Sequence, residues 1–142
     1  MIIRPFKSPC SSPVVLVRKK NGKLRRYVNY RTLNNKTVKD AYVLPRIEDI
    51  FDCLNGAKYF SSIDMKSGYH QIEVEESHKN RIYCWCLGFW EYNNRPFGLS
   101  NSPATYQRVV EECLGDLNMK MCVVYIDDLI IFSRTFKEHL EN

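Results

Sequence analysis

The chain has 142 residues, of which 44% are hydrophobic and 26% charged, and its formal net charge is +5. This composition is typical of a folded globular chain and excludes a disordered one. No apolar run approaches the roughly 20 residues that cross a bilayer, so we expect no transmembrane helix and no membrane partner. Arg4 and Pro5 lie where a secretory signal would be apolar, which predicts an intracellular protein that is not secreted.

The charge is divided unevenly along the chain. Residues 1–46 contain twelve Lys and Arg and a single acid, Asp40, whereas residues 47–142 contain nine basic and fifteen acidic residues. A basic block of this size is typical of a protein with a polyanionic partner. A solvated, Lys-rich surface is the alternative interpretation.

The first predicted element is a hairpin over residues 13–30, because Asn21-Gly22 is a typical hairpin turn between two strand-like runs. Six basic residues lie at and near its tip, namely Arg18, Lys19, Lys20, Lys23, Arg25 and Arg26. Residues 31–45 are polar and rich in Asn and Thr, which predicts a loop.

A helix is predicted next, over residues 46–56, from a stripe of apolar residues with a glycine just past its end. Residues 59–65 predict a strand that ends at the turn Lys66-Ser67-Gly68. Residues 69–74 could continue as a strand after that turn.

The second half of the chain begins with a predicted hairpin formed by residues 81–86 and 89–94. Residues 100–117 predict the longest helix, with Pro103 in its first turn. Two further strands and a final helix are predicted at 121–126, 129–132 and 135–142. This alternation predicts an α+β fold, an antiparallel sheet with helices packed on one face.

Asp127 and Asp128 interrupt the apolar run of residues 123–132. Buried carboxylates without a partner are strongly disfavoured, and two adjacent ones also repel. A solvated turn between two strands is one interpretation, and a site for a hard divalent cation such as Mg²⁺ is the other. Asp64 also ends an apolar strand before a turn, and two such aspartates on neighbouring strands would suit two-metal phosphoryl transfer.

The segment Tyr125-Ile126-Asp127-Asp128 resembles the YxDD box of reverse transcriptases. Three further blocks follow the order of that family: VVLVRKKNGKLRRYVNYRTLN, YVLPRIEDIFDCLNGAKYFSSIDMKSGYHQI and GFWEYNNRPFGLSNSPATYQR. Together they cover nearly the whole chain. The chain is most similar to polymerases of Ty3/gypsy-type LTR retrotransposons, and retroviral enzymes are more distant.

The resemblance implies a right-hand polymerase with fingers and palm and with the thumb absent. It implies that residues 1–142 are a fragment of one reverse transcriptase domain. Residues 1–58 and 75–100 would be fingers-like, and residues 59–74 and 101–142 palm-like.

The site residues that the resemblance implies fall into four groups. The catalytic acids would be Asp64, Asp127 and Asp128. The metal ligands would be Asp64, Met65 and Asp127, binding two Mg²⁺ ions, with Mn²⁺ as the alternative. The nucleotide contacts would be Lys19, Arg25, Tyr69, Phe97, Gly98 and Gln107, although Tyr69 could be simple core and the two basic residues could be solvated. The primer or template contacts would be Lys20, Lys23, Arg26 and Tyr125.

The implied function is RNA-directed DNA polymerisation, in which deoxynucleoside triphosphates extend a primer 3′-OH on an RNA or DNA template. The expected partners include the rest of a Pol polyprotein, with thumb and RNase H, and the expected location is the cytoplasm or a virus-like particle. The alternative is a catalytically silent nucleic-acid-binding remnant. Three departures from the family pattern favour it: Asn29 for the usual Asp, Asn80-Arg81-Ile82 for Thr-Ala-Phe, and Arg95 for Met.

Overall fold

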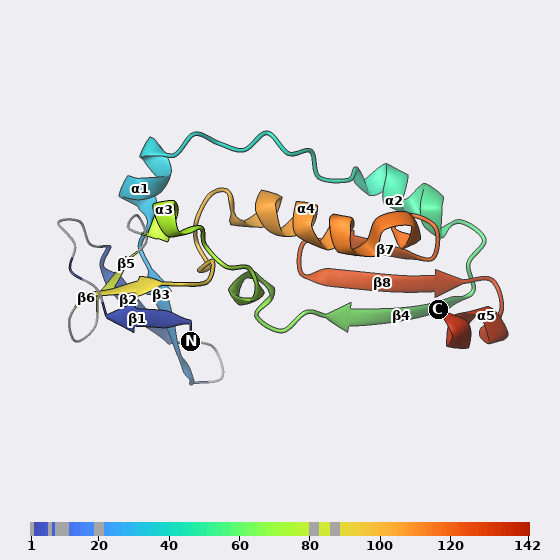
Figure 1. Ribbon diagram of the computed structural model, residues 1–142. Coiled ribbons are helices and arrows are strands. Elements are labelled where there is room, and N and C mark those ends of the chain that lie inside the picture. Colours follow the sequence, from blue (N-terminus) through green and yellow to red (C-terminus); the bar gives the residue numbers. More distant parts are fainter. Residues whose placement is uncertain (1, 6, 8–11, 19–21, 80–82, 86–88) are drawn as a thin grey trace. The chain divides into compact units, whose positions relative to one another are not determined.

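The computed structural model describes residues 2–5, 7, 12–18, 22–79, 83–85 and 89–142 (Figure 1). The chain separates into two compact units. Unit 1 comprises Met1–Lys39 and Tyr69–Ser102, and unit 2 comprises Asp40–Gly68 and Pro103–Asn142. None of the helices within the described part of the chain has the length and apolar character needed to cross a membrane.

Unit 1 contains two small antiparallel sheets. The predicted first hairpin is confirmed as β2 (Val14–Arg18) paired with β3 (Leu24–Val28). The second sheet has the strand order β1-β6-β5, with β1 at Ile3–Pro5, β5 at Tyr83–Trp85 and β6 at Phe89–Tyr92. The pairing of β5 with β6 confirms the second predicted hairpin, whereas β1 had no clear signal in the sequence.

The prediction of a loop over residues 31–45 is wrong at its start, where α1 spans Arg31–Lys36. Two tertiary hydrogen bonds explain the difference. Asn34 Nδ2 donates to Gly98 O at 2.9 Å, and Asn34 Oδ1 accepts from Ser100 N at 3.0 Å. A residue that disfavours a helix by propensity is therefore held in one by a distant segment.

The prediction of a strand over residues 69–74 is also wrong. A 3₁₀ turn occupies Gly68–Gln71, and only an isolated bridge joins Glu73 to Asn94. The short helix α3 (Glu76–Lys79) follows it. The turn carries Tyr69 and Val74 into buried positions, and Val74 packs with Tyr30 in the small core of the unit.

Unit 2 is built on one antiparallel sheet with the strand order β4-β8-β7 (Figure 1). The strands are β4 (Tyr59–Asp64), β7 (Cys122–Tyr125) and β8 (Asp128–Ser133), as the sequence predicts. The central strand β8 pairs with β4 from Tyr59↔Ser133 at one end to Asp64↔Asp128 at the other. The predicted acids therefore lie at one end of this sheet.

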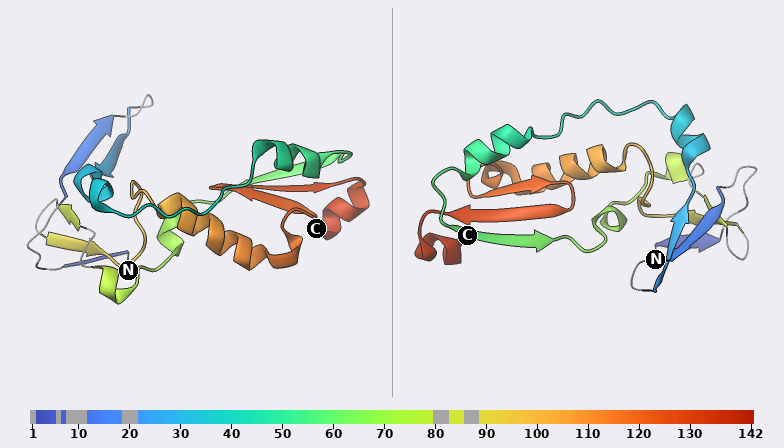
Figure 2. Two further views of the ribbon diagram at one scale, coloured as in Figure 1. Left: turned by 90° about the horizontal axis from the view of Figure 1, so that it is seen from above. Right: turned by 180° about the vertical axis from the view of Figure 1, so that it is seen from behind.

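Three helices accompany the sheet of unit 2, and all were predicted. They are α2 (Ile47–Leu54), α4 (Ser102–Leu114, continued by a 3₁₀ turn over Gly115–Leu117) and α5 (Phe136–Glu141). Thr135 and Glu138 form a capping box at the start of α5. This helix lies at the Ser133 end of the sheet (Figure 2), where Phe136 contacts Tyr59 with a ring-centroid distance of 5.6 Å. Helices and antiparallel sheets occur together, which confirms the α+β class.

Candidate active site

The β7–β8 hairpin places Asp127 in a tight turn. Tyr125 and Asp128 form the last pair of the ladder, so Ile126 and Asp127 are the turn residues. Ile126 has a φ of 56°. For a β-branched residue this left-handed conformation costs on the order of 1–3 kcal/mol and persists only when surrounding contacts enforce it. The position of the Asp127 carboxylate therefore depends on a strained turn.

Asp64 and Asp128 lie directly opposite each other on β4 and β8. Directly opposed residues of an antiparallel pair place their side chains on the same face of the sheet. The backbone N–H of Met65 donates to Asp127 O at 3.0 Å, which ties the end of β4 to the turn. The structure thus brings the three predicted catalytic acids together, although 63 residues separate Asp64 from Asp127 in the sequence.

The Asp127 carboxylate lies in an unfavourable electrostatic environment. Burial raises the pKa of this carboxyl group, and the negative charges of Asp64 and Asp128 raise it further. Its Oδ1 atom is buried and has no hydrogen-bond partner among the described residues. A buried, unpartnered carboxylate oxygen next to two further acids is the environment that a divalent cation stabilises.

The donor set around Asp127 fits Mg²⁺ only in combination with other oxygen atoms. Within the described ranges, no group of three or more His, Cys, Asp or Glu side chains is arranged to hold a metal ion. Proteins often bind Mg²⁺ through only one or two carboxylates, however, and substrate phosphates complete the coordination. Asp64 and Asp127 match that pattern.

Behind the acids, Tyr106 packs closely against the turn that follows β4. Tyr106 is 3% exposed, and its hydroxyl donates to Met65 Sδ at 3.1 Å. A Cβ atom at Gly68 would lie 2.3 Å from Tyr106 Oη. Gly68 is therefore required because the tyrosine occupies the space of a side chain.

We expect Gly68→Ala to lower the free energy of unfolding by roughly 2–3 kcal/mol, the upper part of the range for overpacking. Gly115→Ala is the matched control, because a Cβ there meets nothing within 4 Å and only the left-handed φ of 50° opposes it. That conformation alone costs an L-residue roughly 1–2 kcal/mol. Urea denaturation of both variants measures the difference, and equal losses would contradict the steric explanation.

Gln107 on α4 forms hydrogen bonds with the backbone of the strained turn and of the strand before it. Its side chain is 0% exposed, its Nε2 donates to Val124 O at 2.9 Å, and its Oε1 accepts from Ile126 N at 2.7 Å. This use of the amide differs from the predicted direct contact with a nucleotide. Sequence reasoning missed the connection because nothing in the sequence shows which α4 side chain faces the turn.

The other predicted nucleotide contacts lie in unit 1. Tyr69 is 8% exposed, and its ring lies 4.9 Å from that of Phe97 between centroids. Gly98 has a φ of 95°, which a residue with a side chain rarely adopts, and its carbonyl accepts from Asn34. The structure thus groups Tyr69, Phe97 and Gly98, while Tyr125 lies in unit 2 and is 38% exposed.

The predicted basic contacts are described only in part. Lys19 and Lys20 lie outside the described residues. Arg25 and Arg26 lie on β3, opposite Val17 and Leu16 in the ladder. Lys23 precedes this strand and is exposed. The role of the hairpin in binding phosphates therefore stays a prediction.

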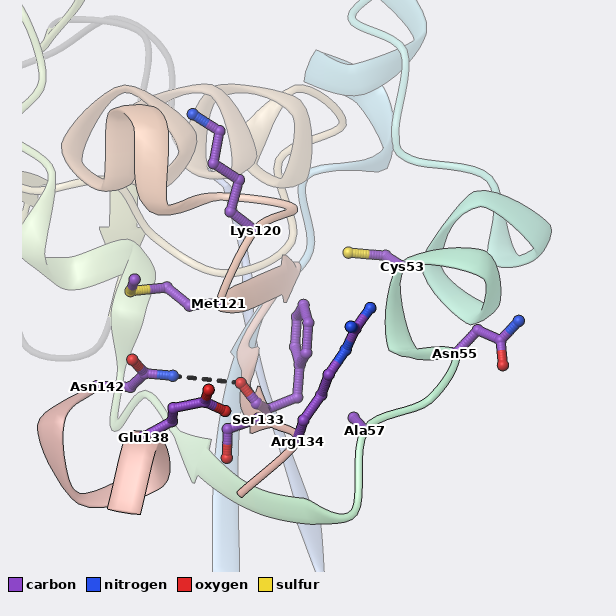
Figure 3. Close-up of a pocket in the computed structure, with 10 residues that line it drawn as sticks. Cys53, Asn55, Ala57, Lys120, Met121, Ser133, Arg134, Glu138 and Asn142 are labelled. Carbon is purple, nitrogen blue, oxygen red and sulfur yellow. Dashed lines mark hydrogen bonds between the residues drawn. The ribbon is translucent and has the colours of Figure 1, made fainter. Parts of the chain in front are cut away.

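A pocket of about 430 Å³ lies in unit 2 at the opposite end of the sheet from the acids (Figure 3). Ala57, Met121 and Phe132 form part of its lining. Asn142 also lines it, and its side-chain Nδ2 donates a hydrogen bond to Phe132 O at 3.3 Å (Figure 3). None of the predicted site residues that the structure describes lines this pocket. It is therefore separate from the candidate active site.

Comparison with known proteins identifies the family. The family model "Reverse transcriptase (RNA-dependent DNA polymerase)" matches residues 17–142. The Pol polyprotein of transposon 297 from Drosophila melanogaster is 42% identical over 99% of this chain and 14% of the polyprotein. The enzymatic polyprotein of Cauliflower mosaic virus (strain Strasbourg) is 38% identical over 98% of this chain and 21% of the polyprotein. The chain thus spans about a seventh to a fifth of the length of these curated relatives.

Solved structures confirm the predicted fold. The foamy viral protease-reverse transcriptase in complex with RNA/DNA hybrid matches with a TM-score of 0.87 at 23% identity, over 99% of this chain and 19% of that one. The foamy viral protease-reverse transcriptase dRH in complex with double-stranded DNA matches with a TM-score of 0.82 at 24% identity, over 99% of this chain and 25% of that one. With the family model covering residues 17–142, these findings show that the chain belongs to the reverse transcriptase (RNA-dependent DNA polymerase) family.

Proposed function

We propose that the chain is the fingers-and-palm part of an RNA-directed DNA polymerase within a retroelement Pol polyprotein. It extends a primer 3′-OH with deoxynucleoside triphosphates on an RNA or DNA template. The observation that carries this proposal is the convergence of Asp64, Asp127 and Asp128 at one end of the unit 2 sheet, around a buried carboxylate oxygen with no hydrogen-bond partner in the described part of the chain.

Asp64 and Asp127 are the proposed ligands of two Mg²⁺ ions, with Mn²⁺ as the alternative, and Met65 lies beside them as the third proposed ligand. Bound divalent ions would stabilise the charge on the attacking and leaving oxygens of an in-line phosphoryl displacement. Asp128 adds a negative charge next to Asp64, which favours cation binding. Tyr125, which precedes the turn and is partly exposed, is the proposed contact for the primer end.

Unit 1 supplies the proposed nucleotide and phosphate contacts. Tyr69, Phe97 and Gly98 form an aromatic and glycine cluster that suits a nucleotide sugar and base. Lys19 and Arg25 are proposed to bind the triphosphate. Lys20, Lys23 and Arg26 are proposed to bind the phosphates of primer and template. Phosphoryl transfer depends mainly on positioned cations of this kind rather than on covalent chemistry.

We assign unit 1 to the fingers and unit 2 to the palm. These limits place residues 40–58 with the palm and residues 69–74 with the fingers, unlike the limits inferred from the sequence. The proposed partners are a primer–template, deoxynucleoside triphosphates and the thumb and RNase H regions of a Pol polyprotein. The proposed location is the cytoplasm or a virus-like particle, as suggested by the transposon relatives.

Single-turnover primer extension with excess chain, an RNA template and Mg²⁺ tests the proposed function. We expect slow extension, and we expect Asp64→Asn to reduce it at least a hundredfold, because metal ligation supplies several kcal/mol of transition-state stabilisation. Extension that survives Asp64→Asn would refute the site. Tight binding of primer–template with no extension at any Mg²⁺ concentration would support the second candidate, a silent nucleic-acid-binding module, which the substitutions Arg81 and Arg95 favour.

A further inference from the structure

The turn that holds Asp127 needs an external support. Ile126, with its φ of 56°, is the only residue of this hairpin in the left-handed region within the described part of the chain. The turn therefore stores strain that contacts outside the hairpin must balance. The side chain of Gln107 provides two such contacts, one to Val124 on the strand before the turn and one to Ile126 in the turn.

These two contacts use opposite ends of one amide group. The Gln107 carbonyl accepts the Ile126 N–H at 2.7 Å, and the amino group donates to Val124 O at 2.9 Å. An amide rotated by 180° would place its amino group against the Ile126 N–H and its oxygen against the Val124 carbonyl. Both contacts would then be repulsive, so the support works in only one orientation of the amide.

Glu111, one helical turn further along α4, selects this orientation. Its Oε1 atom accepts from Gln107 Nε2 at 2.6 Å. An ionised carboxylate can only accept hydrogen bonds, so the end of the Gln107 amide that faces it must be the amino group. The carbonyl end is thereby directed at Ile126.

A hydrogen bond from Tyr42 holds the Glu111 carboxylate in place. Its other oxygen, Oε2, accepts from the hydroxyl of Tyr42. This hydrogen bond, together with burial, raises the pKa of Tyr42 to about 12, so the hydroxyl stays a donor at neutral pH. Arg108 lies over the Tyr42 ring at 4.8 Å and binds both carboxylate oxygens of Asp40, at 3.0 and 2.8 Å. The hydrogen bonds that link Tyr42, Glu111, Gln107 and Ile126 thus each have a defined direction.

We infer that Gln107 is a positioning residue for the Asp127 turn, and that Glu111 fixes the orientation of the Gln107 amide. The inference rests on the proposed function, because it assigns the support of the turn to the placement of a metal-binding carboxylate. Gln107 acts through Ile126 and touches no substrate. Its amide positions the Asp127 carboxylate because it holds Ile126, the preceding residue, in a conformation that isoleucine rarely adopts.

Amide hydrogen exchange of Ile126, measured by NMR on the chain without metal, tests the support directly. Gln107→Leu replaces the amide with an apolar side chain of similar size and removes the acceptor, so we expect exchange at Ile126 to accelerate about tenfold or more. Glu112→Gln is the matched control for changes on α4, because Glu112 is an exposed neighbour of Glu111. We expect no change there, and an unchanged exchange rate in Gln107→Leu would overturn the inference.

Mn²⁺ binding, followed by electron paramagnetic resonance without nucleic acid, tests the consequence for the site. Groups that orient a metal ligand typically contribute 10–100-fold to affinity, so we expect Gln107→Leu to weaken binding about tenfold. Faster exchange with unchanged Mn²⁺ affinity would overturn the positioning role. Equal Mn²⁺ binding by the wild-type chain and Asp127→Asn would instead refute the proposed metal site, and with it the catalytic use of the turn.

A reciprocal exchange of the two side chains tests the orientation argument. Gln107→Glu alone places a second carboxylate against Glu111. It also removes the two hydrogen bonds that Gln107 Nε2 donates, so amide exchange at Ile126 should accelerate or the fold should be destabilised. Adding Glu111→Gln restores an amide–carboxylate pair in reverse, with an acceptor still facing Ile126, whereas the Val124 carbonyl stays without its donor. We expect the double variant to recover at least half of the loss on a logarithmic scale, and no recovery would overturn the role of Glu111.

Discussion

Asp127→Asn is expected to abolish Mg²⁺-dependent primer extension and, in the metal-free chain, to raise the melting temperature by a few degrees. Both effects have one cause. The Asp127 carboxylate is partly buried and lies near Asp64 and Asp128, and one of its oxygens has no hydrogen-bond partner among the residues that the structure describes. An amide of the same shape removes the like-charge repulsion, but it also removes the negative charge that a divalent cation requires.

The gain in stability that we expect from Asp127→Asn should be larger at high pH than at low pH. Burial and the neighbouring acids raise the pKa of Asp127 in the folded chain above the ordinary value of 3.8 for an aspartate. As the pH rises from that value through the folded pKa, the unfolded chain loses its proton first, and the wild-type chain loses stability. The advantage of Asp127→Asn is therefore full above the folded pKa and disappears as the pH falls to about 3.8.

Thermal unfolding in EDTA across this pH range, repeated with Mg²⁺ at neutral pH, measures both parts of the prediction. Mg²⁺ should stabilise the wild-type chain and leave Asp127→Asn unchanged. Asp52→Asn is the control, because Asp52 is an exposed acid on α2. A melting temperature that falls in Asp127→Asn, or that still responds to Mg²⁺, would contradict the interpretation of the site.

Neutralising the basic hairpin is expected to have the second large effect, a loss of most of the salt dependence of primer–template binding. The variant replaces five residues with Gln, namely Lys19, Lys20, Lys23, Arg25 and Arg26. If each contacts one phosphate, the slope of log K against log salt on duplex DNA changes by about 4.5. Between roughly 50 and 200 mM salt, the variant then loses several hundredfold less affinity than the wild-type chain.

The control for this variant removes the same number of positive charges from residues 47–142. It replaces Lys58, Lys79, Lys120, Arg134 and Lys137 with Gln. The net charge of the two variants is identical, so only the position of the charges differs. Fluorescence anisotropy at several salt concentrations measures the slopes, and similar slopes would show that the hairpin has no specific role.

Much of the fold could be predicted from local signals in the sequence. Asn21-Gly22 between two strand-like runs marks the first hairpin, and Thr135 with Glu138 marks the start of α5. These signals act within a few residues, so the local sequence is sufficient. Asp64, Asp127 and Asp128 could also be identified as candidate site residues. Asp64 ends an apolar strand and Asp127 interrupts an apolar run, where a carboxylate is unfavourable unless a partner compensates its charge.

The sequence by itself thus determined strands β2 to β8, the main helices, the family and the acids of the candidate site. Tertiary structure decided the rest, because the deciding contacts join distant residues. Asn34 holds α1 through bonds to residues 64 and 66 positions away, which overrides a loop-like composition. Gly68 is needed because of Tyr106, and Tyr42 reaches Glu111 across 69 positions. The left-handed conformation of Ile126 is the clearest case, since the preference of isoleucine opposes it and the buried amide of Gln107 enforces it.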